Sequence, residues 1–126
     1  MKSRIFNFFA ILFTVILTIG TVEAADAKKG KKVYKKCKAC HSINKGGKNK
    51  VGPNLYGIVG RKAAQVKGFK YSKALKNSSL TWDDATLDKF LKKPKKLVKK
   101  TKMAFGGIKK DSQRADLIAY LKSNSD

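Results

Sequence analysis

The sequence predicts one small all-α domain behind an N-terminal export segment. The chain has 126 residues, which is enough for a single domain. After the export segment, apolar residues recur at helical spacing near both ends of the chain. Between about Ser42 and Leu80 the sequence is instead rich in Gly and Lys and lacks the alternation of a strand. Together these observations indicate helices joined by long loops.

The first residues have the layout of a secretory signal peptide. The first four carry two positive charges, and Ile5–Gly20 is apolar apart from three polar residues. Val22 and Ala24 suit the −3 and −1 subsites of a cleavage site. We therefore expect a signal peptide over residues 1–24, a mature domain over residues 25–126, and, in a bacterium, a periplasmic location.

Two alternatives to this cleavage stay open. Cleavage after Ala25 fits the same small residues, and an uncleaved segment would hold the domain against the membrane. The sixteen residues of the apolar stretch fall short of the roughly 20 that span a bilayer comfortably, which favours removal of the segment.

The first helix of the mature chain is expected to begin at Asp26, a residue type that caps helices well. Its apolar positions have helical spacing and are Ala27, Gly30, Val33, Tyr34 and Cys37. The glycine in this stripe suggests the close approach of another element.

Further helices are expected in the second half of the chain. Ser72–Lys76 forms at most one short helix. Thr81–Asp84 resembles a capping box and opens a helix that ends before Pro94, and Lys95–Lys100 adds one more turn. The apolar positions of the capped helix are Leu87, Phe90 and Leu91.

The last helix is expected to start near Asp111 or Ser112 and to run to about Ser123. Its inner face is formed by the aliphatic stem of Arg114 and by Leu117, Ile118 and Leu121, with Tyr120 beside them.

Composition excludes several classes of site. With two Cys and one His, the chain has too few ligands for a Cys₄ or Cys₂His₂ zinc site and cannot form several disulfides. A Ser-His-Asp hydrolase would have to use His41, which directly follows a cysteine. A hydrophobic content of 42% argues against wholesale disorder.

The expected helices alone would form a thin core. The mature chain has few aromatic residues, and its Gly- and Lys-rich loop is long for a compact domain. A loop of this length is either disordered or organised around something. We infer that a large apolar group completes the domain.

Cys37-Lys38-Ala39-Cys40-His41 is the C-x-x-C-H signature of haem c attachment. Two thiols three positions apart can each add to a haem vinyl group, and the histidine that follows then lies under the iron as the proximal ligand. Both cysteines and the single histidine of the chain fall in this pentapeptide. The motif therefore predicts one covalent haem c, with the long loops wrapped around it.

Two other uses of these residues are weaker. A redox-active C-x-x-C pair suits an exported protein, but it leaves His41 and the long loop unexplained, and no βαβ pattern surrounds it. A zinc ion would find at most three ligands in one short run of residues.

Met103 is the only internal methionine, and a lone methionine most often fills a gap in a core. Because no second histidine exists, it is also the strongest candidate for the sixth iron ligand. A soft thioether favours ferrous iron and raises the reduction potential. Two protein ligands leave no open site for substrate, which favours electron transfer over an enzyme. The alternative is a peroxidase-like protein in which Met103 is off the iron.

Four further segments accompany the attachment motif: Gly52-Pro53-Asn54-Leu55, Gly60-Arg61-Lys62, Thr101-Lys102-Met103 and Asp116-Leu117-Ile118-Ala119-Tyr120-Leu121. With these segments the chain resembles the class I c-type cytochromes, of the short mitochondrial and bacterial cytochrome c2 type, over about Ala27–Ser123. The resemblance implies a small single-domain cytochrome c fold in which the N- and C-terminal helices cross. At this crossing Gly30 and Tyr34 would pack against Leu117 and Tyr120.

The resemblance also implies the surroundings of the haem. Pro53 would offer its carbonyl to the ring N–H of His41 and so orient the imidazole. Arg61, Tyr71 and Trp82 match positions that surround the buried haem propionates, where their donors would compensate the carboxylates.

Several positions depart from the family pattern. Phe90 and Leu75 stand where a tyrosine and an asparagine are common, which would make the haem pocket drier. Asn49 stands where mitochondrial members often carry a histidine. Lys99-Lys100 replaces a Pro-Gly pair before Met103, which would make the ligand loop more mobile.

The formal charge of +22 exceeds what solubility needs, although lysine runs usually coat a solvated face. By the resemblance, lysines ring the exposed haem edge, at Lys36, Lys50, Lys95, Lys96, Lys102 and Lys109. Such a ring would steer a monomeric carrier to acidic docking sites on membrane redox complexes. The implied donor is a cytochrome bc1 complex, and the implied acceptor is a cytochrome c oxidase or a photosynthetic reaction centre.

Nucleic acid is a poor partner for this charge. The mature chain has only two Arg, the residue type that base readout favours, and it has no nucleic-acid-binding motif. Attraction to anionic lipids is more credible and would keep the carrier near the membrane.

Overall fold

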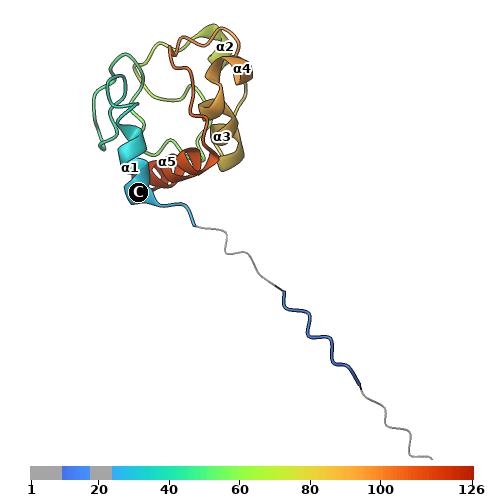
Figure 1. Ribbon diagram of the computed structural model, residues 1–126. Coiled ribbons are helices and arrows are strands. Elements are labelled where there is room, and N and C mark those ends of the chain that lie inside the picture. Colours follow the sequence, from blue (N-terminus) through green and yellow to red (C-terminus); the bar gives the residue numbers. More distant parts are fainter. Residues whose placement is uncertain (1–9, 18–23) are drawn as a thin grey trace, which may run out of the picture.

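The computed structural model describes residues 10–17 and 24–126, and within them the chain forms five helices (Figure 1). They are α1 (Ala27–Tyr34), α2 (Lys73–Lys76), α3 (Asp84–Lys92), α4 (Pro94–Leu97) and α5 (Asp111–Ser123). The described residues contain no strand, and their one β pairing is an isolated antiparallel bridge between Lys62 and Thr81. The prediction of a small all-α domain is confirmed.

The terminal helices α1 and α5 pack against each other at one end of the domain (Figure 1). A Cβ at Gly30 would overlap the backbone oxygen of Asp116, so the two backbones can meet only because position 30 lacks a side chain. Beside this contact the rings of Tyr34 and Tyr120 lie 5.4 Å apart. The predicted crossing of the terminal helices is confirmed.

Asp26 fastens the start of α1 in two ways. Its side chain accepts hydrogen bonds from the backbone N–H groups of Lys28 and Lys29, which caps the helix as predicted. Its own backbone N–H donates to Asp116 Oδ1 on α5 at 2.8 Å. The cap is therefore also a link between the two terminal helices.

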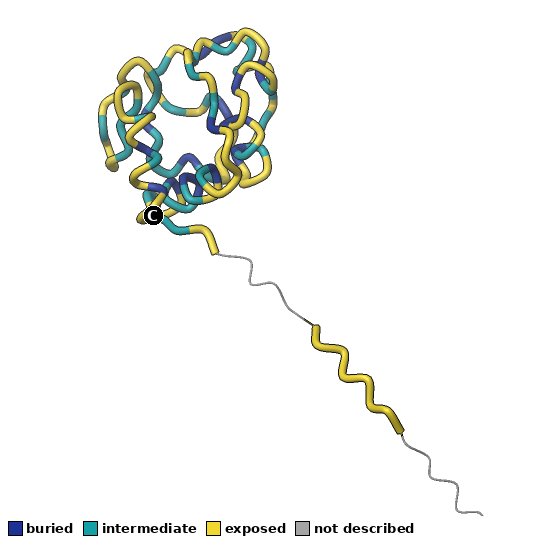
Figure 2. The backbone as a smooth tube through the Cα atoms, in the orientation of Figure 1, coloured by how far each residue is buried: buried dark blue, intermediate teal, exposed yellow. Residues whose placement is uncertain are grey.

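The core lies between α5, α3 and the segments packed on them (Figure 2). The buried face of α5 has the predicted composition: Arg114, Leu117, Ile118 and Leu121. On α3 the buried side chains are Leu87, Phe90 and Leu91, also as predicted. Both helices thus turn their apolar stripes inward.

Three helices differ from the expectation at one or both ends. The helix α3 is capped by Asp83 and not by Thr81. The side chain of Asp83 accepts a hydrogen bond from the N–H of Thr86 at 2.8 Å. Thr81 belongs to the isolated bridge, and the N–H of Trp82 next to it donates to the oxygen of Arg61 at 2.8 Å. Pairing with a distant segment of the chain, residues 61–62, therefore holds Thr81 and Trp82 outside the helix.

The helix α4 begins at Pro94, because proline suits the first turn of a helix, and it ends at Leu97. The expected turn over Lys95–Lys100 is cut short, and Lys100 has a left-handed φ of 65° that no α-helix continues. At the other end of the domain α1 stops at Tyr34. Cys37 consequently lies in the hydrogen-bonded turns that follow the helix.

The long loop between the attachment motif and α3 is held by hydrogen bonds to distant segments. The N–H of Leu55 donates to the oxygen of Ser42, and the N–H of Ala63 donates to the oxygen of Leu80. The short helix α2 interrupts the loop, and Ser72 caps it through the N–H of Leu75. This agrees with the single short helix expected here.

The predicted signal peptide lies partly outside the described residues, which omit 1–9 and 18–23. Its described part, residues 10–17, contains no helix and is exposed (Figure 2). The exposed residues there include large apolar ones such as Leu12 and Phe13. In the part of the chain that the structure describes, no helix has the length and apolar composition needed to cross a membrane.

Candidate haem site

The turn that follows α1 presents the two thiols of the C-x-x-C-H motif. The N–H groups of Cys40 and His41 both donate to the oxygen of Cys37, at 3.0 and 2.9 Å, which closes the turn. Both cysteines are free thiols; Cys37 is half-buried and Cys40 is exposed. Burial raises the pKa of the Cys37 thiol to about 11, so this thiol is protonated at neutral pH in the folded polypeptide.

The imidazole of His41 is oriented by a backbone carbonyl. Its Nδ1 lies 2.7 Å from the oxygen of Pro53. A carbonyl oxygen only accepts, so Nδ1 carries the proton and Nε2 keeps its lone pair. Burial lowers the pKa of His41, which favours the neutral imidazole that binds metals.

Two further residues shape the surroundings of this imidazole. A Cβ at Gly52 would overlap the His41 ring, so the backbone at position 52 lies directly against it. The hydroxyl of Tyr34 donates to the backbone oxygen of His41 at 2.9 Å. Burial raises the pKa of Tyr34 to about 12, which keeps that hydroxyl proton in place. Gly52 and Tyr34 connect His41 to its own loop and to α1.

The loop that carries Pro53 is braced by a buried amide. The Nδ2 of Asn54 donates to Ser42 Oγ at 2.7 Å and to the oxygen of Asn44 at 3.0 Å. The backbone N–H of Asn54 donates to Asn49 Oδ1 at 2.9 Å. These bonds fix the residue next to Pro53, so they also limit movement of the carbonyl that holds His41.

Met103 lies in the extended segment between α4 and α5. Its backbone N–H donates to Thr101 Oγ1 at 3.3 Å, and its half-buried side chain packs against the hydrophobic core. The thioether of Met103 therefore faces the hydrophobic core from the non-helical segment between α4 and α5.

Three residues match family positions around the haem propionates, and they differ in burial: Arg61, Tyr71 and Trp82. Trp82 is buried with its ring 4.8 Å from that of Phe90. Tyr71 is buried, and its hydroxyl accepts from the N–H of Val66 at 3.0 Å. Burial raises the pKa of Tyr71, and the nearby charge of Arg61 acts in the opposite direction. The side chain of Arg61 itself is exposed.

Two departures from the family pattern place apolar side chains here. Phe90 is buried against Trp82, and Leu75 packs half-buried on the core. Neither side chain can donate a hydrogen bond, so both positions make their surroundings less polar. The third departure, Asn49, is a polar residue that makes hydrogen bonds. Its Nδ2 donates to the oxygen of Lys67 at 3.1 Å, in addition to the bond that its Oδ1 accepts from Asn54.

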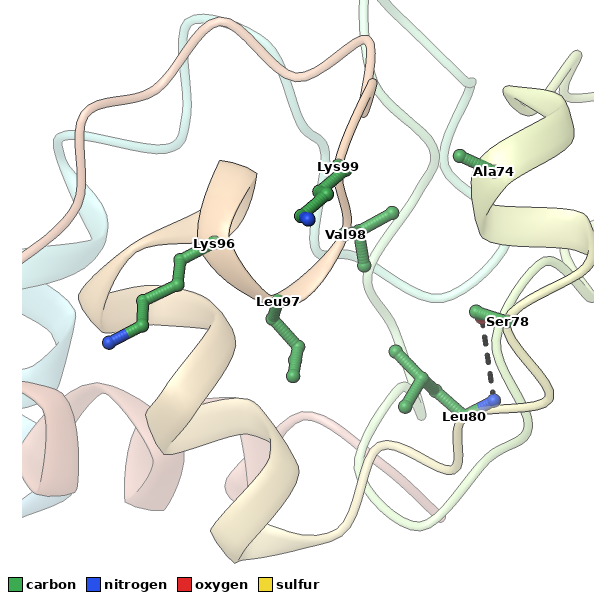
Figure 3. A pocket seen from close by; sticks show the side chains of 7 residues that line it. All are labelled: Ala74, Ser78, Leu80, Lys96, Leu97, Val98 and Lys99. Atoms are coloured by element: carbon green, nitrogen blue, oxygen red, sulfur yellow. Dashed lines mark hydrogen bonds between the residues drawn. The ribbon is translucent and has the colours of Figure 1, made fainter.

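A pocket of about 370 Å³ opens between α2, α4 and the segments that follow them (Figure 3). Its walls are mainly apolar and include Leu80, Leu97 and Val98. Lys96 and Lys99 also line the pocket, and Figure 3 shows the amine of Lys96 turned away from the apolar walls. The second half of the domain therefore offers apolar surface that a large hydrophobic group could cover.

The residues present fit a covalently attached haem. The motif supplies two free thiols and an imidazole with an available Nε2, and Met103 supplies a thioether. Around the core, loop and helix segments contribute apolar side chains that are only partly buried: Val33, Ile43, Leu55, Val59, Leu75, Leu80, Leu97 and Phe105. Among the described residues, no group of three or more His, Cys, Asp or Glu side chains could hold a metal ion.

The six lysines matched to the haem edge are all exposed. Among them, Lys50 donates its amine to the oxygen of Lys38 at 2.7 Å. Elsewhere, the whole side chain of Arg114 is buried, including its guanidinium, whereas the sequence predicts only its aliphatic stem in the core. A charged residue among the apolar positions of α5 was the available signal.

Comparison with known proteins identifies the family of this chain. The cytochrome c family model matches residues 27–125. Cytochrome c2 of Blastochloris viridis is 43% identical over 97% of this chain and 93% of its own length. Cytochrome c2 of Rhodomicrobium vannielii is 52% identical over 78% of each chain.

A solved structure, cytochrome cH from Methylobacterium extorquens, is 49% identical and matches with a TM-score of 0.75. The match covers 79% of this chain and 99% of that one. The chain therefore belongs to the cytochrome c family: it is an electron carrier rather than an enzyme, its cofactor is covalently attached haem c, and Cys37 and Cys40 fit the attachment motif.

Proposed function

We propose that this chain carries single electrons in the periplasm through a haem c joined to Cys37 and Cys40, with His41 and Met103 as the axial ligands of the iron. The observation that carries the proposal is the orientation of His41. The carbonyl of Pro53 holds Nδ1 at 2.7 Å and leaves Nε2 available for iron. When bound, haem supplies a one-electron couple between ferrous and ferric iron.

The protein contributes ligand type, orientation and exclusion of other ligands. Pro53 and Gly52 orient the imidazole, and the hydrogen bond that Nδ1–H donates to the Pro53 carbonyl increases the basicity of Nε2. The thioether of Met103 is a soft ligand, which stabilises the ferrous state and raises the reduction potential. With His41 and Met103 both holding the iron, no position would remain open for a substrate.

Arg61, Tyr71 and Trp82 are proposed to compensate the haem propionates. Trp82 and Tyr71 are buried and Arg61 contributes a nearby positive charge, so donors and charge come from three separate positions of the long loop and its end. Buried carboxylates need such partners, because removal from water is costly.

The proposed docking surface consists of the exposed lysines Lys36, Lys50, Lys95, Lys96, Lys102 and Lys109. It would bring the carrier first to a cytochrome bc1 complex and then to a cytochrome c oxidase or a photosynthetic reaction centre. Contacts of electron carriers are small and short-lived, and complementary charge mainly raises the rate of encounter. Anionic lipid headgroups would attract the same charge and keep the carrier near the membrane.

Export is proposed from the leader, with cleavage after Ala24. Ala24 and Ala25 are exposed, so the bond between them is open to a peptidase. The intact mass of the protein recovered from a bacterial periplasm tests this. A chain beginning at Ala25 agrees with the proposal, whereas a retained leader would contradict it.

The axial ligand is tested by Met103→Ala, produced together with a haem-attachment system. We expect loss of the far-red thioether-to-iron absorption band of the ferric protein, a lower reduction potential, and rapid cyanide binding. Leu97→Ala, which shortens another half-buried apolar side chain, is the control and should keep the band. A wild-type protein that lacks the band at neutral pH would favour the peroxidase-like alternative.

The docking surface is tested by Lys95→Glu and Lys102→Glu. We expect a slower second-order reaction with purified cytochrome c oxidase at low salt and a weaker dependence of that rate on ionic strength. The control is Lys76→Glu, which makes the same charge change at an exposed position of α2 outside the proposed ring. Equal effects of all three substitutions would contradict a localised docking surface.

A further inference from the structure

The segment that carries Met103 has few restraints of its own. At its start, the N–H of Val98 donates to the oxygen of Pro94 at 2.9 Å, and the N–H of Thr101 donates to the oxygen of Val98 at 3.1 Å. From there to Asp111 it contains no helix. The position of Met103 therefore depends on how the two ends of this ligand loop (residues 98–110) are anchored.

The returning end of the ligand loop is anchored to α3. The N–H of Ile108 donates to the oxygen of Leu91 at 2.8 Å, and Ile108 is only 2% exposed. One residue earlier, Gly107 has a φ of 107°, and a Cβ there would overlap the backbone oxygen of Lys92. The chain thus passes closely over the end of α3 at residues 107–108.

Arg114 of α5 holds the same end from the other side. Its Nη1 donates to the backbone oxygens of Ile108 and Lys109, at 2.8 Å each. Its Nε donates to Asp88 Oδ1 on α3 at 2.7 Å, and its Nη2 contacts Asp111. One guanidinium, 2% exposed, therefore joins α3, α5 and the end of the ligand loop.

Geometry and charge make this contact hard to replace. The guanidinium presents its donors in a rigid fork, and two carboxylates compensate its charge. If Arg114 were lost, the oxygens of Ile108 and Lys109 and the carboxylate of Asp88 would each lose a donor. Buried acceptors without a donor are costly, so the loop end would shift towards water or other partners.

We propose that Arg114 is a positioning residue for Met103: by holding the carbonyls of Ile108 and Lys109, it fixes the return of the ligand loop and keeps the thioether on ferric iron. The inference rests on the proposed function, in which Met103 is the sixth ligand. Its effect falls on the ferric state, because a soft thioether binds ferric iron less well than ferrous iron.

Two substitutions separate positioning from stability. Arg114→Lys keeps the charge but replaces the fork by a single ammonium, which cannot bond both carbonyls and Asp88 in the same geometry. Asp88→Asn is the matched control, because it removes the charge pair with α3 and leaves both carbonyl bonds of Arg114 intact. Both variants are expected to lower the free energy of unfolding.

The test is stopped-flow binding of imidazole to the ferric holoprotein. At saturating imidazole the observed rate equals the rate at which Met103 leaves the iron. We expect this rate to rise about tenfold in Arg114→Lys and to stay within about twofold of wild type in Asp88→Asn. In Arg114→Lys the amide of Ile108 should also exchange with deuterium faster, and the ferric thioether band should weaken.

Equal rates in wild type, Arg114→Lys and Asp88→Asn, with both variants destabilised, would overturn the inference and leave Arg114 a purely structural residue. If Arg114→Lys does not fold with haem, Arg114→Gln replaces it; an unchanged rate there also overturns the inference. A wild-type protein without the thioether band overturns the proposed ligation itself, and the inference with it. The band of the wild type therefore distinguishes the two failures.

Discussion

At position 52 the backbone lies so close to the imidazole of His41 that only hydrogen fits on the Cα. A methyl group there would overlap the ring and push it away from Pro53. For Gly52→Ala we expect a loss of about 2–3 kcal/mol in the free energy of unfolding, from steric overlap and the lost hydrogen bond, measured by denaturant titration of the ferric protein.

The matched control for this prediction is Gly106→Ala. A Cβ at Gly106 meets no atom within 4 Å, and this glycine lies in a segment of similarly irregular backbone. The Gly106→Ala substitution should change the free energy of unfolding by less than about 1 kcal/mol. Equal losses in the two variants would contradict the account of the His41 surroundings.

Lys100 pays a conformational cost just before Met103. Its φ of 65° is left-handed, where a side chain is disfavoured by roughly 1–2 kcal/mol. Because glycine also gains entropy when unfolded, Lys100→Gly should stabilise the protein by a smaller amount, about 0.5–1 kcal/mol. Thermal unfolding measures this. Lys99→Gly changes a position without positive φ and should not stabilise the protein. If Lys99→Gly and Lys100→Gly both stabilised it, the cause would be the lost charge rather than backbone strain.

At the residue scale the sequence predicts groups that are adjacent in the chain. The two thiols and His41 form one motif, so their chemistry is readable without a fold. The roles of Gly52 and Arg114 are not, because the atoms that define them belong to other segments. The overlap at Gly52 depends on how its loop folds onto the ring, and the partners of Arg114 come from α3 and the ligand loop.

Among the elements, α3 depends on the charge of its cap. The N–H of Thr86 donates to the carboxylate of Asp83, and this hydrogen bond lowers the pKa of Asp83 below its usual 3.8. A lowered folded-state pKa stabilises the fold above the unfolded pKa, and this stability is lost as the pH falls through the folded pKa. Acid should therefore weaken the start of α3.

Asp83→Asn tests this contribution, because asparagine caps a helix about as well but does not titrate. We expect similar stability to wild type at pH 7 and a shallower loss of stability between about pH 5 and 2, measured by unfolding curves at each pH. Asp126→Asn is the comparison variant. It removes another exposed carboxylate whose pKa is lowered, here by Lys45, and it lies outside α3. Superimposable pH profiles of wild type and Asp83→Asn would contradict the role of the carboxylate.

Periodicity predicts which helices exist more accurately than where they begin. The range of α5 and its inner face follow from its apolar spacing. The start of α3 does not, because Thr81 and Trp82 pair with residues 61 and 62, and that long-range pairing competes with the local capping signal. In α1 the reason is local instead: the hydrogen-bonded turns that follow Tyr34 hold Cys37 and replace the last expected helical turn.

For the whole molecule, the thin core of the polypeptide implies dependence on haem. Many apolar side chains around the core are only partly buried, among them Leu55, Leu75 and Phe105. Cys37→Ala/Cys40→Ala, which prevents attachment, should therefore have a far lower melting temperature than the holoprotein and reduced helical circular dichroism. A double variant that melts cooperatively at the temperature of the holoprotein would contradict this.

The overall fold was predictable because the helical stripes and the attachment motif agree on one small domain built around a cofactor. The course of the long loop was not predictable from spacing alone. It is set by single hydrogen bonds over long distances, such as those of Asn54 and Ala63, which leave no periodic signal. The exposure of the six candidate docking lysines follows from their charge.

The optical spectrum of the purified holoprotein tests covalent haem attachment and Met103 ligation together. The ferric and then the ferrous spectrum would be recorded, followed by extraction with acidified acetone. We expect a sharp α-band in the reduced form, a thioether-to-iron band in the oxidised form, and haem that stays with the protein on extraction. Haem that is extracted, or protein that acquires none when produced with a haem-attachment system, would contradict a covalent His41/Met103 cytochrome.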